Sequence, residues 1–326
     1  MDDGTARLGN PTAPPGQAGL GPRPDAPAPI TATSRGGSLI FLHIPKTAGT
    51  TLSVIIDRQF PRDAIFTIDG ADIRGSVTQF IQLPETARAR IQCLKGHMAF
   101  GLHPYLRSPS RYLTLLRHPV DRIVSHYHHT RGLVGHPFHD AIASGRMSLT
   151  DYVKSGIARD LSDGQTKLIS GVFSGEPASR DLLPLARQNL QEHFAAVGLA
   201  ERFDESLILF KRLLGWRNVL YAPQNVSHDR PPLREVPRAT VELIERQNAL
   251  DAELYAFGQA ELDRLIRVQG AGYAREVATF RRWNAVYARL WRGYQRCRSG
   301  ARRGLQALGR PGPGTSASGS VERPPR

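Results

Sequence analysis

The sequence predicts an α/β fold, in which a mainly parallel sheet is flanked by helices and a helical part follows at the C-terminal end. Short apolar runs, typical of strands covered on both faces, alternate along the chain with segments whose apolar residues recur at helical spacing. Strands interleaved with helices in this way need crossover connections, which make neighbouring strands parallel. At 326 residues the chain is long enough for one sizeable domain of this class with appendages.

The first strand and helix are predicted close to the start of the ordered chain. The run LIFLHI after Ser38 reads as a buried strand, and the turn-forming loop PKTAGTT follows it. The next segment, LSVIIDRQF, has Leu52, Ile55, Ile56 and Phe60 on one side of a helix. We therefore expect strand, loop and helix in this order.

Three further strands are expected. A helix at 84–89 leads into RIQCLKGH, a strand that ends on Gly96 and His97. The next run, RYLTLLRH, stops at Pro119, and proline is well tolerated at the first position of the helix predicted for 119–130. The last strand is expected at 195–199, with a helix at 203–214 after it. Further helices are predicted within 238–267.

Composition divides the chain into four parts. Residues 1–37 and 309–326 are rich in Pro and Gly or Ser and poor in large apolar side chains, so we expect both to be disordered. The formal net charge is +14, and from Gly272 onward twelve Arg stand against two Glu. The catalytic domain is therefore expected at 38–272, and 273–308 is expected to form a basic, aromatic helical extension.

The cellular setting follows from what the sequence lacks. Cys93 and Cys297 are too few and too far apart for a disulfide framework or a zinc site, which favours a reducing compartment. No apolar stretch reaches the roughly 18 residues of a membrane span, and the N-terminal residues lack the plan of a signal peptide. We expect a cytoplasmic protein, with peripheral membrane contact through 273–308 as a further expectation.

The loop PKTAGTT is the first candidate for a ligand site, because ligands of parallel α/β sheets bind beyond the carboxyl ends of the strands. The N-terminus of the following helix attracts anions, and Lys46 adds a full positive charge. Thr47, Thr50 and Thr51 offer hydroxyl donors, while Gly49 allows close approach of a ligand. In a Walker A loop the Lys follows the glycines, but here it precedes them, so the loop is P-loop-like without being an ATP signature.

Two motifs resemble those of the PAPS-dependent carbohydrate sulfotransferases, the group that includes heparan sulfate 2-O-sulfotransferase (PAPS is 3'-phosphoadenosine-5'-phosphosulfate). HIPKTAGTTL is similar to the 5'-phosphosulfate loop of that group, and LLRHPVDRIVSHY is similar to its 3'-phosphate site. The resemblance implies that Arg117 and Ser125 bind the 3'-phosphate, and a guanidinium can clamp a phosphate bidentately. Weaker likenesses in DGQTKLISG, VGLAERFDESLILF and YAPQNVSHDR extend it over about residues 38–235.

The resemblance also implies a fold and a reaction. The sheet should be like that of P-loop NTPases, PAPS should be the donor, and a hydroxyl of a carbohydrate or glycolipid should be the acceptor. Sulfuryl transfer is an in-line displacement in which stabilisation of the leaving group matters most, and Lys46 is expected to stabilise the leaving phosphate. The base that takes the proton of the acceptor hydroxyl is expected to be His97, with His103 and Asp121 as alternatives.

Other interpretations remain open at this level. A metal site built on His126 and His129 is not expected, because these histidines lack Cys or carboxylate partners nearby in sequence and the chemistry needs no ion. Arg122 either contacts the donor or forms a surface ion pair. A nucleotide-dependent kinase with an atypical loop, and a non-catalytic binder of anions or nucleic acid acting through the Arg-rich tail, are the alternative functions. Nucleic acid is not the expected partner.

The Arg-rich tail itself has several interpretations. It could bind an anionic membrane or an acidic polysaccharide, and its apolar face could simply pack on the core with solvated arginines, which is the favoured interpretation. The identity of the acceptor, the position that is sulfated and the oligomeric state cannot be read from the sequence.

Overall fold

The computed structural model describes residues 37–106, 109–155, 162–173, 178–223 and 233–308. Residues 1–36 and 309–326, which the sequence predicts to be disordered, lie outside the described residues, as does most of the segment YAPQNVSHDR.

The described residues contain a five-stranded sheet in which every pair of neighbouring strands is parallel. The strand order is β2-β3-β1-β4-β5. The strands are β1 (Ser38–Leu42), β2 (Ile65–Ile68), β3 (Cys93–Gly96), β4 (Ser110–Leu116) and β5 (Phe194–Leu199). The chain changes direction across the sheet next to β1, which has β3 on one side and β4 on the other. The α/β class with a parallel sheet flanked by helices is confirmed.

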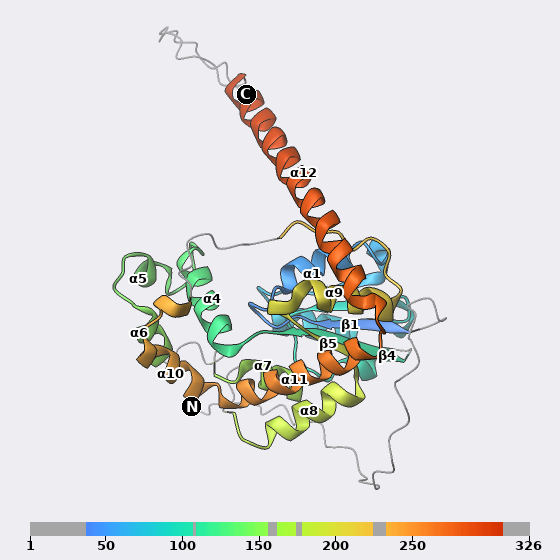
Figure 1. The fold of residues 1–326 in the computed structure, drawn as a ribbon, viewed down its shortest axis with the longest axis horizontal. Helices are drawn as coiled ribbons and strands as arrows, with labels where there is room; N and C mark the ends of the chain where they lie inside the picture. Colours follow the sequence, from blue (N-terminus) through green and yellow to red (C-terminus); the bar gives the residue numbers. More distant parts are fainter. Residues whose placement is uncertain (1–36, 107–108, 156–161, 174–177, 224–232, 309–326) are drawn as a thin grey trace, which may run out of the picture.

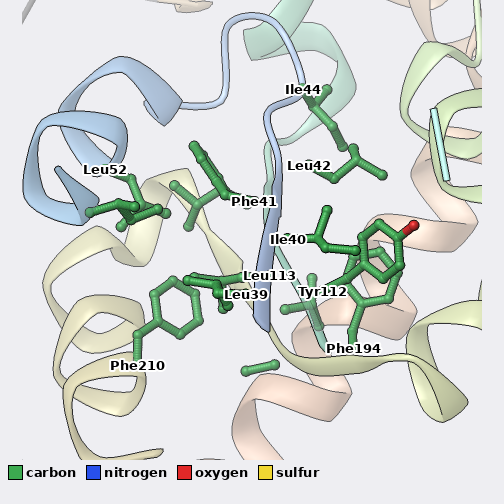
Figure 2. Packing of buried hydrophobic residues seen from close by; sticks show 14 of the residues in the cluster. Leu39, Ile40, Phe41, Leu42, Ile44, Leu52, Tyr112, Leu113, Phe194 and Phe210 are labelled. Carbon is green, nitrogen blue, oxygen red and sulfur yellow. The ribbon is translucent and has the colours of Figure 1, made fainter. Parts of the chain in front are cut away.

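The central strands are buried on both faces, as their continuous apolar runs predict. Along β1 the side chains alternate, so that Leu39 and Phe41 point to one face of the sheet and Ile40 and Leu42 to the other (Figure 2). Leu52 and Phe210 pack on the first face, and Tyr112 and Phe194 lie on the second. This two-sided core fixes β1, and therefore the loop that follows it, in a rigid frame.

Helices cover both faces of the sheet (Figure 1). One layer contains α1 (Gly49–Ile56), α9 (Phe203–Leu214) and the start of α12 (Gly272–Leu308). The opposite layer contains α7 (Gly164–Ser170), α8 (Leu182–Glu192) and α11 (Ala249–Arg267). Near β2 and β3 the chain also forms α2 (Ile73–Gln82) and α3 (Glu85–Arg88).

A smaller cluster of helices lies beside the sheet, next to α4 (Pro119–Arg131) (Figure 1). It consists of α5 (His139–Ala143), α6 (Leu149–Lys154) and α10 (Arg238–Gln247). Its apolar core is separate from that of the sheet and includes Ile123 of α4, Tyr152 of α6 and Ile244 of α10. The cluster anchors the outer side of α4, the helix expected to carry Ser125.

Most sequence-predicted elements are present, with small shifts at their ends. The helix predicted for 203–214 matches α9 at both ends, and α4 extends one residue beyond the predicted 119–130. Strand β2 and helix α2 were not predicted. In β2 only Ile68 is fully buried, so the short edge strand IFTI lacks the continuous apolar run of a central strand.

Candidate active site

The loop between β1 and α1 has an unusual backbone. Lys46 and Ala48 have φ of 69° and 65°, in the left-handed region that residues with a Cβ seldom adopt. Such conformations persist where the surroundings enforce them, and they gather at ligand sites. Helix α1 begins at Gly49, directly after Ala48, so the positive end of its dipole lies at this loop. The loop and helix end together form a cradle whose backbone arrangement suits an anion.

A cleft of about 580 Å³ opens above this cradle. Among the residues lining it are seven that the sequence predicts to bind the donor or to act in catalysis. These are Lys46, Gly49, Thr50, Thr51, His97, Arg117 and Ser125. Residues from the ends of β1 and β4, from the turn after β3 and from two helices thus meet at one place, at the edge of the sheet expected from its parallel topology.

Arg117 is held from several directions. Its guanidinium Nη1 donates a hydrogen bond to the carbonyl of Lys46 at 3.0 Å, and its Nη2 lies 3.8 Å from Asp121 Oδ1. Gln165 grips its backbone, because Gln165 Oε1 accepts from the Arg117 amide and Gln165 Nε2 donates to the Arg117 carbonyl, each at 2.9 Å. Gln165 is fully buried in α7. The end of β4 is therefore fixed on the side facing away from the cleft.

Four other residues named from the sequence lie differently. Thr47 is buried and its hydroxyl donates to the carbonyl of Ile44, so it shapes the loop from inside and does not line the cleft. His103 does not line the cleft either and packs beside Tyr112. Asp121 lies beside Arg117, as described above. Arg122 is buried with Asp251 Oδ2 at 3.6 Å, which corrects the idea of a surface ion pair.

His97 has a defined tautomer. Its Nδ1 lies 2.8 Å from the carbonyl oxygen of His43, which can only accept a hydrogen bond, so Nδ1 carries the proton. The other ring nitrogen, Nε2, then has a free lone pair. Burial lowers the pKa of His97, although the His43 carbonyl opposes this shift. At neutral pH the ring is uncharged and able to accept a proton.

The ring of His43 packs against the ring of His97. The two rings stack with their centroids 4.2 Å apart. Burial, together with the positive charge nearby, lowers the pKa of His43 to about 3. His43 also fills the space beside Gly49, where a Cβ would overlap its ring. One buried, neutral ring thus contacts both the candidate base and the start of α1.

Histidines also line the side of the cleft formed by α4. His126 Nδ1 lies 2.9 Å from the hydroxyl of Tyr152, and burial lowers its pKa to about 3. His129 and His136 lie further along the cleft, and burial lowers the pKa of His129 as well. Among the residues that the structure describes, no group of three or more His, Cys, Asp or Glu side chains is arranged to hold a metal ion.

Several lining residues were not predicted from the sequence. His43 stands three residues before Lys46 in the motif HIPKTAGTTL, but its contact with His97 joins residues that are far apart in the chain. Phe203 and Tyr221 form an aromatic pair with ring centroids 4.9 Å apart at another side of the cleft. Phe203 and Tyr221 belong to the segments VGLAERFDESLILF and YAPQNVSHDR, which were the available signal.

Comparison with known proteins gives a consistent set of relatives. A family model described as galactose-3-O-sulfotransferase matches residues 170–297. Galactosylceramide sulfotransferase of Bos taurus is 29% identical over 308 residues, which cover 86% of this chain and 71% of the relative. Galactose-3-O-sulfotransferase 3 of Bos taurus is 28% identical and covers 73% of this chain, which spans only 59% of that protein.

Among solved structures, mouse sulfotransferase SULT7A1 in complex with PAP matches with 14% identity and a TM-score of 0.34, over 68% of this chain and 67% of that one. The likeness is distant, and the fold class stands on the strands themselves.

Two expectations from the sequence need correction. The family model and the relatives carry the names galactose-3-O-sulfotransferase and galactosylceramide sulfotransferase, so the finer resemblance to heparan sulfate 2-O-sulfotransferase is not supported. The cytoplasmic location is wrong, because these relatives are Golgi-type sulfotransferases, typically membrane-anchored enzymes of the lumen. Cysteine scarcity was therefore a poor guide to compartment. In the described part of the chain, no helix has the length and apolar character needed to cross a bilayer.

Proposed function

We propose that the chain is a carbohydrate sulfotransferase that uses PAPS as donor, and that its acceptor is a hydroxyl of a galactose unit in a saccharide or glycolipid. The names of the relatives support galactose, since both galactosylceramide and galactose-3-O transfer appear in them. The 3-hydroxyl is the position that these names favour.

One observation carries the proposal for the site. The cradle at Lys46, the unprotonated Nε2 side of His97 and the guanidinium of Arg117 belong to a single cleft of about 580 Å³. In our proposal the cradle binds the 5'-phosphosulfate, and Arg117 with Ser125 binds the 3'-phosphate. Phe203 and Tyr221, at another side of the same cleft, offer an aromatic surface against which the adenine can stack.

The proposed reaction is a single in-line displacement. The acceptor hydroxyl oxygen attacks the sulfur, a new O–S bond forms, and the bond between the sulfur and the bridging phosphate oxygen breaks. The hydroxyl proton passes to His97 Nε2, which leaves an imidazolium ion. The bridging oxygen and its negative charge leave with the 3',5'-bisphosphate, where Lys46, the amides at the start of α1 and the hydroxyl of Thr50 or Thr51 stabilise the charge.

The donor part of the proposal is tested by thermal stabilisation. The 3',5'-bisphosphate product should raise the melting temperature of the full chain more than AMP or ATP at equal concentration, because only the bisphosphate offers a 3'-phosphate to Arg117. Arg117→Gln should remove most of the difference between the bisphosphate and AMP. A larger shift with ATP would favour the kinase alternative and overturn the donor site as proposed.

The acceptor part is tested by turnover. With labelled PAPS, a β-galactoside should accept sulfate, whereas its 3-deoxy analogue should not. Transfer to the 3-deoxy compound at an equal rate would refute the assigned position. Bisphosphate binding without transfer to any sugar would instead favour the non-catalytic alternative.

A further inference from the structure

Helix α12 has two different apolar faces. The first packs on the body of the protein, and its buried residues follow each other at helical spacing. They are Tyr273, Val277, Phe280, Asn284 and Ala288. Polar contacts strengthen the attachment, because Glu276 pairs with Lys211 and Arg212 of α9, and the Tyr221 amide donates to Asn284 Oδ1 at 2.8 Å. The first part of α12 is therefore a fixed element of the fold.

Beyond this attachment the helix projects away from the body (Figure 1). A second apolar face begins on the attached part at Trp283 and continues onto the projecting part, about a third of a turn around the helix from the first. Its members range in exposure from 50% for Val286 to 68% for Leu290. The full set is Trp283, Val286, Leu290 and Tyr294, and these are large side chains left in water along one stripe. A stripe of this kind on a soluble protein marks a surface that meets a partner.

The charges on α12 are separated from the second apolar face. At about 100° per residue, Arg281 and Arg292 lie opposite the second apolar face, whereas Arg282 and Arg289 lie about a quarter turn from it, and all four are exposed. Arg281 pairs with Asp204 and Glu205 of α9. From Val277 to Leu308 the sequence has eight Arg and no Asp or Glu. The projecting helix is therefore both amphipathic and uniformly cationic.

We propose that the second apolar face of α12 docks on an anionic lipid surface, lying along the interface without crossing it. Trp and Tyr favour the boundary between headgroups and acyl chains, and arginines on the other side can reach anionic headgroups. A second copy of the chain fits less well, because two such helices, each with eight Arg and no Asp or Glu from Val277 to Leu308, would repel one another.

This inference does not depend on the proposed acceptor. None of the residues of the second apolar face is among the described residues that line the catalytic cleft, so lipid docking and sulfuryl transfer can succeed or fail separately. Docking would hold the full enzyme at the surface where a glycolipid presents its sugar.

The test is co-sedimentation of the full chain with vesicles of phosphatidylcholine alone or with about one third phosphatidylserine. Binding should be strong only to the anionic vesicles. The triple variant Trp283→Ser, Leu290→Ser, Tyr294→Ser should lower the bound fraction at least tenfold. The triple variant Arg282→Gln, Arg289→Gln, Arg292→Gln should weaken binding to anionic vesicles and reduce its dependence on salt. A matched control, Val134→Ser, Leu185→Ser, Val268→Ser, removes exposed apolar side chains elsewhere and should bind as the wild type.

Three results would overturn the proposal: no binding of the wild type to anionic vesicles, equal binding by the apolar-face variant, or a wild-type dimer that becomes monomeric in that variant. The last would assign the face to a second copy. If an oligonucleotide competes with the vesicles and the binding does not depend on Trp283, then the arginines bind nucleic acid and the proposal is wrong. Bisphosphate stabilisation and transfer to a soluble galactoside, measured on the same variants, report separately on the proposed function.

Discussion

At the scale of single residues, the most informative contact in the cleft is the one between His97 Nδ1 and the carbonyl of His43. It fixes which nitrogen of His97 bears the proton, and the stacked ring of His43 fixes the plane of the imidazole. A base held in one tautomer and one orientation loses little entropy when the acceptor hydroxyl arrives. His43 therefore acts as a positioning residue in the proposed reaction.

Replacement of the proposed base should separate catalysis from binding. In His97→Ala, kcat should fall by about 10²–10⁴-fold, the range typical of a lost general base. The affinity for the 3',5'-bisphosphate, measured by calorimetry, should change little, because the donor cradle does not include the imidazole. The same substitution at His103, which does not line the cleft, is the control and should leave kcat within a few fold. Retained turnover in the first variant would refute the role of His97.

The two hydrogen bonds between the Gln165 side chain and the Arg117 backbone should matter specifically for recognition of the 3'-phosphate. Gln165→Leu removes both hydrogen bonds that the Gln165 side chain makes to the Arg117 backbone, which should cost about 1–3 kcal/mol and displace the end of β4. The ratio of bisphosphate to AMP affinity should fall about tenfold.

Asn189→Leu provides the matched control for this variant. The buried side-chain amide of Asn189, on α8, donates a hydrogen bond to the carbonyl of Ile169 on α7, and this bond does not involve Arg117. It should lower stability while leaving the affinity ratio intact. An equal loss of the ratio in both variants would mean that Gln165 acts only through general stability.

At the scale of elements, the start of α1 depends on the absence of a side chain at Gly49. A Cβ there would overlap the ring of His43, which cannot retreat because it is stacked on His97. Gly49→Ala should therefore lower the free energy of unfolding by about 1–3 kcal/mol and also abolish stabilisation by the bisphosphate. Gly272→Ala, where a Cβ meets nothing within 4 Å, should be nearly neutral. Denaturant titrations with and without bisphosphate measure both quantities.

The elements that sequence could predict are those whose signal is local. Strand β1 and the loop after it stand out because an apolar run is followed at once by Lys46 and Gly49, and β4 stands out because Pro119 ends it. Strand β2 was missed because an edge strand needs few apolar residues. The same limit applied to the candidate site, where Gln165 reaches Arg117 across 48 positions of the chain, a pairing that only the fold creates.

At the scale of the whole molecule, the buried histidines make stability depend on pH. His43 and His126 have pKa values of about 3 in the folded protein, whereas an unfolded chain takes up these protons below about pH 6.5. The stability that depends on these two rings being neutral is fully present above pH 6.5 and is lost as the pH falls toward 3. Asp163 works in the opposite direction, because burial raises its pKa to about 6, and it offsets part of the loss.

The net result should be a loss of about 2 kcal/mol between pH 7 and pH 5, which corresponds to roughly 5 °C in melting temperature. His126→Gln removes one of the titrating histidines and should therefore lose less stability over the same range. Circular dichroism melts at pH 7, 6 and 5 make the comparison. A melting temperature that rises toward pH 5 would contradict the linkage.

The hydrogen bond from Arg117 to the carbonyl of Lys46 joins the residues proposed for the two ends of the nucleotide into one thermodynamic unit. In the proposed complex, ordering of the guanidinium by a 3'-phosphate should also steady the cradle that binds the 5'-phosphosulfate, so occupancy of one end should raise affinity at the other, and by linkage the effect is reciprocal. The losses of bisphosphate binding free energy in Lys46→Ala and in Arg117→Gln should then not add up to the loss in the double variant. The difference is a measurable interaction energy. Natural variation at these two positions would for the same reason be epistatic, since a change at either one alters the consequence of a change at the other.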